Sequence, residues 1–520
     1  MKRRDFLQLS LTGAALAALP LPALLRADES FLSTLAELPR LQPDGEGRFQ
    51  LTLAPSRVEL NGTATELWLY NGRLGPVLEV TEGDRVEVRV TNRLSQPTTV
   101  HWHGLRVPAT EDGGPHDTIA PGESRWYRFT VPEGNAGLHW FHPHPHGHTA
   151  EQIAHGAAGL ILVRPKASPL PAYPRQLLMV NDLRLDQDGR VAPHTMADWM
   201  NGREGGLLLV NGGRQPALVR APGSEERFGL VNACAGRYLH LRLEGGTFWL
   251  LGTDGGLLAA PELRDELLLV PGQRADLLLA WPSKGGEERL LFSQPYDRGW
   301  MGPEPEHYRR PQPLLRLVAN REPAATVPEL PDDLARIDWL PAAAVSRELV
   351  LSELMPEGHP HRGDAGHHAH GGHQGHGEEQ QREPAGHGAH QDHAMAAMPA
   401  SAQQALDQGL AFLINGRAFD MAHIMFTGKV GQVEEWLLEN DSHMDHPFHV
   451  HGTHFQVVAE QERGGDWRPL AQPRWLDTVN LRPYQKLKLR LRFDQPGDWL
   501  FHCHIIEHEE LGMMATIRIV

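Results

Sequence analysis

The sequence predicts an all-β protein made of three copies of one β-sandwich. Short runs alternate apolar and polar residues, as where Val86, Val88 and Val90 are separated by charged residues. This period of two is typical of half-buried strands. The 53 glycines and 41 prolines indicate many turns. A chain of 520 residues is long enough for about three or four domains of ~150 residues each.

Two signals recur and place the three copies along the chain. An Asn-Gly pair follows an apolar run at Asn71, Asn211 and Asn415. Later in each copy a proline turn precedes another alternating strand, at Pro121-Gly122, Pro271-Gly272 and Pro483-Tyr484. We therefore expect domains at residues 45–166, 172–322 and 336–520.

Residues 1–27 predict an export signal. Arg3 and Arg4 form a twin-arginine pattern, and a weakly apolar run with a small-residue exit near Ala27 follows it. A membrane anchor is disfavoured, because the run is short and is broken by Pro20 and Pro22. We expect twin-arginine export into a bacterial periplasm.

Charge and cysteine content exclude several classes of protein. The formal net charge of −16 at pH 7 disfavours binding to nucleic acid or to an anionic membrane and tends to attract cations. The two cysteines are Cys234 and Cys503. We interpret Cys234, at the end of an apolar run, as a buried inert thiol. No structural disulfide can form if Cys503 binds a metal.

A histidine-rich insertion at residues 358–393 interrupts the third copy. Ten histidines stand there among Gly, Ala, Gln and Glu, a composition that cannot form a packed core. One interpretation is capture of copper or another soft-to-borderline metal. The other is a solvated loop whose histidines matter little.

The stretch from His502 to Met514 carries the strongest chemical signal. Cys503, His508 and Met513 supply three of the four ligands of a blue copper electron-transfer site. If Cys503 lies on a strand, His502 and His504 project to the opposite face. An electron at Cys503 would then leave through the adjacent peptide units into both histidines.

Four His-x-His pairs lie in the two outer copies, at His101/His103, His142/His144, His449/His451 and His502/His504. Eight imidazoles are the number needed for a three-copper cluster between two domains. Zinc is the simpler alternative for histidine clusters, but it does not explain the Cys/His/Met set.

The first copy keeps the paired histidines without the cysteine. Its Phe141-His142-Pro143-His144 matches Phe501-His502-Cys503-His504, and Thr98 stands where His446 stands. The same comparison matches His148 with His508 and Ile153 with Met513. The first copy therefore can line a shared cluster but cannot hold a blue copper. The middle copy has no such pairs, and we interpret it as a spacer.

These motifs resemble those of the multicopper oxidases, which have three cupredoxin-like Greek-key β-sandwich domains. The twin-arginine signal, Asp112-Gly113-Gly114-Pro115 and the C-terminal stretch are most similar to the periplasmic copper efflux oxidases, which oxidise cuprous ion. The resemblance implies four coppers, one type 1, one type 2 and two type 3. It implies His446, Cys503, His508 and Met513 at type 1, His101 and His449 at type 2, His103, His142 and His504 at one type 3 copper, and His144, His451 and His502 at the other.

The resemblance also implies that four one-electron oxidations of a donor reduce dioxygen to two waters. Asp112 and Glu509 are the carboxylates expected to relay protons, with Glu507 as second choice. Orientation of a ligand imidazole is the alternative role for these acids. His146, His148 and His155 fall outside the family's ligand pattern.

The expected donor is cuprous ion, with phenols as a further substrate, in copper tolerance. Met444 matches a substrate-copper position of the efflux oxidases, and Met355 approximates another or serves packing. Ser442 stands where the family has an acidic residue. The alternatives are a laccase-like phenol or metal oxidase, a non-catalytic copper buffer, and a structural cell-envelope protein, whose known relatives have lost the copper ligands. We expect a monomer.

Overall fold

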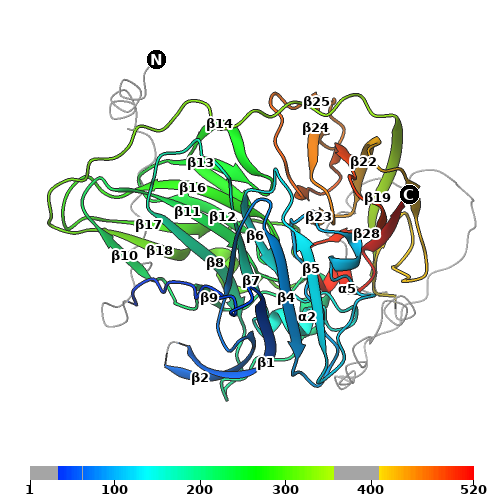
Figure 1. The fold of residues 1–520 in the computed structure, drawn as a ribbon, viewed down its shortest axis with the longest axis horizontal. Helices are drawn as coiled ribbons and strands as arrows, with labels where there is room; N and C mark the ends of the chain where they lie inside the picture. The colour runs from blue at the N-terminus through cyan, green and yellow to red at the C-terminus, as the bar shows by residue number, and fades with distance from the viewer. Residues whose placement is uncertain (1–32, 61, 356–408) are drawn as a thin grey trace, which may run out of the picture.

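Three pairs of β-sheets lie side by side (Figure 1), and we call them the first, middle and third lobes. The computed structural model describes residues 33–60, 62–355 and 409–520. The predicted signal at residues 1–27 and the insertion at residues 358–393 lie outside the described residues. The all-β prediction is confirmed, while the exact domain boundaries stay a prediction.

The first lobe is a sandwich of a four-stranded and a three-stranded sheet. Its elements are β1 (Phe49–Leu60), β2 (Thr63–Tyr70), β3 (Val77–Thr81), β4 (Arg85–Asn92), the 3-10 helix η3 (Ala109–Glu111), β5 (Ser124–Thr130), β6 (Gly137–Phe141), α2 (Thr149–Ala154) and β7 (Gly159–Arg164). The strand orders are β2-β1-β4-β5 and β3-β7-β6. Alternate residues of β4, Val86, Val88 and Val90, are buried in the core between the sheets.

The middle lobe pairs a six-stranded with a five-stranded sheet. Its elements are β8 (Arg175–Leu183), α3 (Met196–Asn201), β9 (Leu207–Val210), β10 (Ala217–Arg220), β11 (Glu225–Asn232), β12 (Leu239–Leu243), β13 (Phe248–Thr253), β14 (Gly256–Arg264), β15 (Glu266–Leu269), β16 (Arg274–Ala280), β17 (Glu288–Gln294), η4 (Glu306–Arg309) and β18 (Gln312–Ala319). The strand orders are β14-β13-β16-β11-β8-β9 and β10-β18-β17-β12-β15. Cys234 is buried in its core, as predicted.

The third lobe also pairs a six-stranded with a five-stranded sheet. Its elements are β19 (Val345–Leu354), β20 (Ala411–Ile414), β21 (Phe426–Gly428), β22 (Val433–Asp441), β23 (His446–Val450), β24 (Phe455–Gln461), β25 (Arg468–Pro469), β26 (Thr478–Leu481), β27 (Lys486–Arg492), β28 (Gly497–Cys503), α5 (Ile506–Glu510) and β29 (Met514–Ile519). The strand orders are β20-β19-β22-β27-β24-β25 and β21-β29-β28-β23-β26. In β27 the three leucines point into the core, while the lysines and arginines between them are more exposed.

One asparagine turn is repeated in all three lobes. Asn71, Asn211 and Asn415 have the left-handed φ angles 55°, 51° and 51°, which asparagine adopts more readily than most residues. Each side-chain Oδ1 accepts a hydrogen bond from a backbone N–H of β1, β8 or β19, from Thr52 at 2.7 Å, Met179 at 2.8 Å and Val350 at 2.8 Å. Each Nδ2 donates to a carbonyl of the same strand. The repeat seen in the sequence is therefore also a structural repeat.

We expect Asn415→Ala to destabilise the third lobe by about 1–2 kcal/mol, because alanine loses both hydrogen bonds and disfavours the left-handed backbone. The melting temperature of that lobe should fall by roughly 2–8 °C in calorimetry. Asn415→Gly loses only the hydrogen bonds and should cost less. An unchanged melting temperature in Asn415→Ala would show that the turn contributes nothing to stability.

The histidine pairs lie on neighbouring backbone segments where the outer lobes meet. His101 forms an isolated antiparallel bridge with His142. His449 of β23 is paired with His502 of β28. Helices α2 and α5 contact each other at this boundary (Figure 1). Each outer lobe thus presents its own two pairs toward the other lobe.

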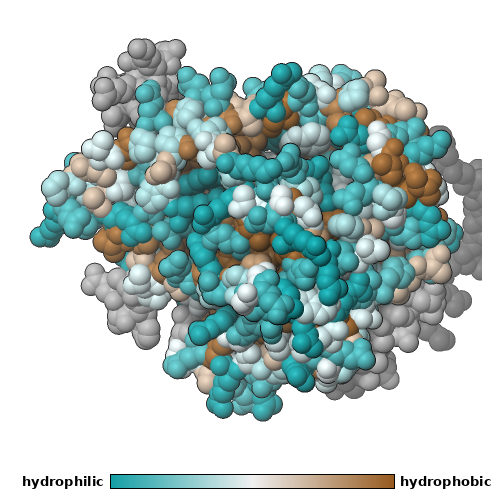
Figure 2. Space-filling model, in the orientation of Figure 1, coloured by the Kyte–Doolittle hydropathy of each residue, from teal (hydrophilic) through white to brown (hydrophobic). Residues whose placement is uncertain are grey.

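Figure 2 shows one face of the molecule, on which hydrophilic side chains predominate and hydrophobic side chains form smaller groups. This agrees with a chain in which 22% of the residues are charged. No helix in the described ranges is both long enough and apolar enough to cross a membrane.

Candidate metal centres

One centre is built around Cys503. His446 begins β23, Cys503 ends β28, and His508 lies in α5. The Cys503 Sγ atom lies 3.6 Å from His446 Nδ1 and 3.8 Å from His508 Nδ1, and these two nitrogens are 3.4 Å apart. Met513 is fully buried in the same apolar core. A sulfur and two imidazole nitrogens around one point match the donor set of a blue copper site.

Contacts on the side away from the sulfur orient the two imidazole rings of this centre. His508 Nε2 donates a hydrogen bond to the Met200 carbonyl at 3.2 Å, and Phe412 stacks on the same ring at 3.8 Å between centroids. The Oγ atom of Ser442 lies 2.9 Å from His446 Nε2. These contacts turn the Nδ1 atom of each ring toward the sulfur, as outer partners of metal ligands do.

The protonation of this centre fits a soft cation. Burial raises the pKa of the Cys503 thiol, because a thiolate without a nearby cation is costly in an apolar core. Burial lowers the pKa of His446 to about 4, so this imidazole is neutral and offers a lone pair. A bound metal would supply the positive charge that converts the thiol into a thiolate.

A second centre gathers the eight paired histidines between the outer lobes. Each is at most 1% exposed: His101, His103, His142, His144, His449, His451, His502 and His504. His502 Nε2 lies 3.3 Å from His144 Nε2 and 3.0 Å from His451 Nε2. His504 Nε2 lies 3.3 Å from His103 Nδ1. The rings of His101 and His449 are 5.9 Å apart between centroids.

Oxygen atoms fix the orientation of most of these rings. Five Nδ1–H groups donate to oxygens: His101 to the Asp112 carbonyl at 3.0 Å, His142 to the Pro143 carbonyl at 2.9 Å, His449 to the Asp477 carbonyl at 2.8 Å, His451 to Asp112 Oδ2 at 2.8 Å and His502 to the Cys503 carbonyl at 2.9 Å. The Nε2 lone pairs then face inward. Among the described residues, the Nε2 atoms of His101, His142 and His449 have no hydrogen-bond partner. Buried nitrogens of this kind need a partner, and a metal cation fits them.

Burial holds the pKa of His142, His144, His502 and His504 well below the usual range, and neighbouring imidazoles lower these pKa values further. These rings are therefore neutral, which is the form that binds metals. The eight imidazoles therefore provide enough donors to bind more than one metal ion at the same time.

Two predicted carboxylates lie directly beside the eight-histidine centre. Burial raises the pKa of Asp112, but the charges of His101 and His451 outweigh it and hold the pKa well below the usual range. Glu509 lies 3.5 Å from His144 Nδ1 and 3.4 Å from His502 Nδ1. Burial raises the pKa of Glu509 well above its usual value, which favours the protonated form of this acid.

The other residues considered in the sequence have the following contacts and places. Glu507 faces His194, whose Nε2 is 3.0 Å from Glu507 Oε1. The His146 ring contacts Phe419, and the His155 ring stacks on Trp68. His148 precedes α2.

Asp477 is a site residue that the sequence patterns did not predict. Its Oδ1 atom lies 3.2 Å from His103 Nε2, and its carbonyl accepts the Nδ1–H of His449. A single aspartate carries no motif. The only signal is that it directly precedes β26, the neighbour of β23.

The predicted alignment of the first lobe with the cysteine site needs correction. In the third lobe the Met513 N–H donates to the His508 carbonyl at 2.9 Å. The same bond joins Ala157 to Gln152 at 3.1 Å in the first lobe. The predicted equivalents, His148 and Ile153, are therefore wrong.

In the first lobe, two neutral side chains joined by a hydrogen bond occupy the place that the cysteine centre has in the third lobe. Thr98 Oγ1 donates to Gln152 Oε1 at 2.7 Å, and Pro143 stands in place of the cysteine. These side chains provide no thiolate and no imidazole. The expectation that the first lobe holds no blue copper is unchanged.

The two methionines of the expected substrate site lie at the core of the third lobe. Met444 is fully buried, and Met355 is half-buried against the same apolar cluster. The Glu353 carboxylate contacts the ring of His443, which precedes Met444. Ser442 donates to Asn440 Oδ1 at 2.8 Å, so its hydroxyl is tied to the end of β22.

Several known proteins similar to this chain are multicopper oxidases. Residues 52–168 and 389–520 match family models described as multicopper oxidase. A solved multicopper oxidase of Campylobacter jejuni, described as a metallo-oxidase, is 34% identical with a TM-score of 0.79, covering 94% of this chain and 95% of that one. A laccase-like oxidase of Ochrobactrum sp., described as active towards lignin model compounds, is 29% identical with a TM-score of 0.74, covering 94% and 100%. A multicopper oxidase of Staphylococcus epidermidis is 28% identical over 86% of this chain and 83% of its own length.

Two further relatives have names that indicate other roles. A copper resistance protein A homologue of Pseudomonas syringae is 25% identical over 92% of this chain and 93% of its own length. The cell division protein FtsP of Photorhabdus laumondii is 26% identical over 99% and 98%.

Proposed function

The chain belongs to the multicopper oxidase family, and from this premise we propose that its two centres hold the four coppers of an oxidase that oxidises cuprous ion. The proposed ligands are His446, Cys503, His508 and Met513 for type 1, His101 and His449 for type 2, His103, His142 and His504 for one type 3 copper, and His144, His451 and His502 for the other. Bound copper would supply one-electron redox chemistry, so that four donors, each giving one electron, together with four protons, would reduce one dioxygen to two waters.

The observation that carries the proposal is the position of Cys503 between the two centres. Its sulfur faces His446 and His508, while its chain neighbours His502 and His504 belong to the eight-histidine centre. One peptide unit separates Cys503 from each neighbour. The Cys503 carbonyl also accepts the Nδ1–H of His502 at 2.9 Å. This covalent route is the proposed path for electrons.

Glu509 and Asp112 divide the proposed proton chemistry. Burial raises the pKa of Glu509, which favours its protonated form, and the carboxyl lies against two proposed ligands, so Glu509 is the proposed proton donor. Asp112 is ionised and accepts the Nδ1–H of His451. Its proposed part in the relay is to orient the rings through this hydrogen bond, because so low a pKa makes the carboxylate a poor proton acceptor.

Several features support cuprous ion as the donor. Met444 lies two residues before the proposed ligand His446 and is buried in the same core, and thioethers suit Cu(I). The Glu353–His443 contact adds a carboxylate next to this segment, where Ser442 offers none. The relatives named as a metallo-oxidase and as a copper resistance protein point in the same direction.

We expect Met444→Leu to lower kcat/KM for cuprous ion by roughly 10–100-fold and to leave phenol oxidation within about twofold, because only the cuprous substrate uses the thioether. Oxygen uptake with each donor measures both rates. Met179→Leu, a change of another buried methionine, should affect neither. Unchanged cuprous oxidation in Met444→Leu would assign Met444 to packing alone.

A laccase-like function is the second candidate, favoured by the similarity to the Ochrobactrum enzyme. Steady-state oxygen uptake of the unaltered protein separates the two functions. The proposal expects cuprous ion to be oxidised faster than a phenol that is assayed without added copper. Faster phenol oxidation would favour the second candidate.

A role in cell division, as in the name of the relative FtsP, or a structural role in the cell envelope has less support, because every proposed ligand position is filled. A copper buffer is disfavoured for the same reason, since storage needs no cysteine joined to an eight-histidine centre. We further propose twin-arginine export to the periplasm and a role in copper tolerance. Fractionation of cells that express the full chain tests the location.

A further inference from the structure

The middle lobe, which the sequence analysis interprets as a spacer, touches the eight-histidine centre. The contact is made by residues 270–274, the turn that leads into β16. Gln273 Nε2 donates to the Thr478 carbonyl at 3.0 Å. Gly272 and Arg274 lie on either side of it and reach the centre itself.

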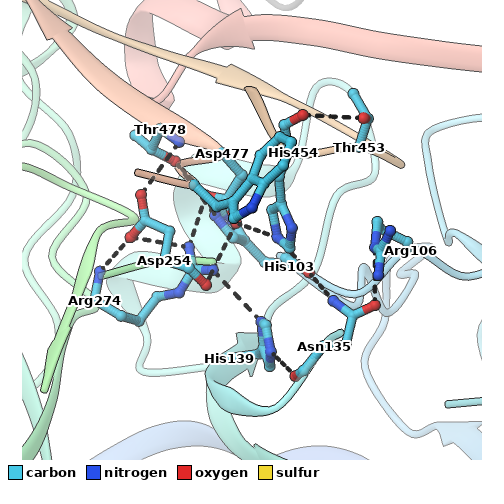
Figure 3. A network of polar contacts seen from close by, with 12 residues as sticks. His103, Arg106, Asn135, His139, Asp254, Arg274, Thr453, His454, Asp477 and Thr478 are labelled. Carbon is cyan, nitrogen blue, oxygen red and sulfur yellow. Dashed lines mark hydrogen bonds and ion pairs between the residues drawn. The ribbon is translucent and has the colours of Figure 1, made fainter. Parts of the chain in front are cut away.

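Arg274 holds Asp477 with two hydrogen bonds (Figure 3). Its Nη1 donates to Asp477 Oδ1 at 2.7 Å and its Nη2 to Asp477 Oδ2 at 2.5 Å. The guanidinium is itself fixed by the carbonyls of Leu138 at 3.2 Å, Gly272 at 3.2 Å and Asp254 at 3.1 Å. Arg274 is only 2% exposed. A paired guanidinium fork fixes both the position and the plane of a carboxylate.

Asp477 in turn contacts two proposed ligands that belong to different coppers. Its Oδ1 lies 3.2 Å from His103 Nε2, and its carbonyl accepts the Nδ1–H of His449 at 2.8 Å. His103 therefore presents Nδ1 to the centre, whereas His449 presents Nε2. One aspartate thus determines which nitrogen each ring offers.

The chain makes room for this arginine. Gly104 follows His103 and has a φ angle of 88°. A Cβ atom there would lie 2.4 Å from Arg274 Nη2 and 2.6 Å from His139 Nδ1. No larger residue fits between the histidine pair and the arginine.

Gly272 approaches a third proposed ligand. Its φ angle is 86°, and a Cβ atom there would lie 2.8 Å from Cδ2 and 2.9 Å from Nε2 of His504. The equivalent turn of the first lobe contains Gly122, whose φ angle is 82° and where a Cβ atom would meet nothing within 4 Å among the described residues. The two glycines share a backbone conformation but differ in what they touch.

We infer that the middle lobe positions the oxygen-reducing centre through residues 270–274. Arg274 orients His103 and His449 by way of Asp477. Gly272 sets the position of the His504 ring by lying close to it. Arg274, Asp477 and Gly272 are positioning residues, because they act through the histidines. The inference rests on the proposed copper ligands.

The matched pair Gly272→Ala and Gly122→Ala tests the contact with His504. Both changes place a Cβ on the same left-handed backbone, but only the first presses on a ligand. We expect Gly272→Ala to bind about one to three fewer coppers per chain and to alter the electron paramagnetic resonance of type 2 copper, while Gly122→Ala retains four coppers and an unaltered spectrum. Equal copper content and spectra in the two variants would overturn the inference.

Arg274→Met tests the hold on Asp477. Copper affinity at the eight-histidine centre should fall by roughly 10–100-fold, while the blue absorption of the cysteine site persists. Arg274→Lys restores the charge and should recover part of the affinity. Arg227→Met, which breaks a bond of 2.7 Å between Arg227 Nε and Asp276 Oδ1 elsewhere in the middle lobe, should leave copper binding unchanged. Wild-type copper affinity in Arg274→Met would contradict the inference.

Copper content and the type 2 signal of the unaltered protein distinguish a failure of this inference from a failure of the proposed function. If it binds fewer than four coppers or shows no type 2 signal, the proposed ligands are wrong. If it binds four and Gly272→Ala matches it, only the role of the middle lobe is wrong. Unfolding of each copper-free variant shows whether a loss of copper reflects a loss of fold.

Discussion

Cys503→Ser should bind three coppers instead of four, lose its blue absorption and lose more than ~100-fold in oxygen uptake. The loss should exceed the roughly 10–100-fold effect of removing a mere partner of a ligand, because both a ligand and the electron path depend on this residue. Serine keeps the size of the side chain but offers no soft donor. Copper analysis, absorption spectra and oxygen uptake check the three parts.

The matched control is Cys234→Ser. Cys234 is the other cysteine of the chain and is buried in the core of the middle lobe. Its replacement should leave the colour, copper content and turnover unchanged. Substantial oxygen uptake by Cys503→Ser with either donor would show that electrons enter the eight-histidine centre by another route.

Glu509→Gln should lower kcat by about 10²–10⁴-fold, the usual range for loss of a positioned acid. The glutamine side chain has nearly the same shape as glutamic acid but no proton to give. The cysteine site should still be reduced by the donor at its normal rate, so the blue colour should stay bleached during turnover. Stopped-flow absorption together with oxygen uptake separates these steps.

The expected pH dependence of oxygen reduction follows from the raised pKa of Glu509. The acid is protonated below this pKa, so oxygen reduction should slow as the pH rises through it, and the Glu509→Gln variant should lack that slope. Glu510→Gln is the control. Burial also raises the pKa of Glu510, to about 8, but this carboxyl accepts the Thr149 N–H instead of facing a paired histidine. An equal loss of kcat in both variants would mean that replacing any buried carboxyl group here lowers the rate.

Local patterns explain what could be predicted from the sequence. The period of two in β4 and β27 predicts their buried faces. The repeated Asn-Gly turns predict three copies, because each asparagine forms its hydrogen bond with the equivalent strand of its own lobe, β1, β8 or β19. The histidine pairs are visible because the same His-x-His pattern recurs in both outer copies.

The remaining site residues depend on contacts between distant parts of the chain. His103 and Asp477 are 374 residues apart, and Arg274 and Asp477 are 203 apart. No local pattern reports such contacts. The faulty alignment of His148 with His508 has a related cause: α2 starts at Thr149, seven residues after His142, whereas α5 starts at Ile506, four residues after His502. A fixed offset therefore pairs residues that occupy different places.

Diffraction from copper-loaded crystals at the copper absorption edge would locate each bound copper. We expect one anomalous peak bounded by His446, Cys503 and His508, and three peaks among the eight paired histidines. A Cys503 without copper, or paired histidines that hold fewer than three coppers in fully loaded protein, would contradict this expectation.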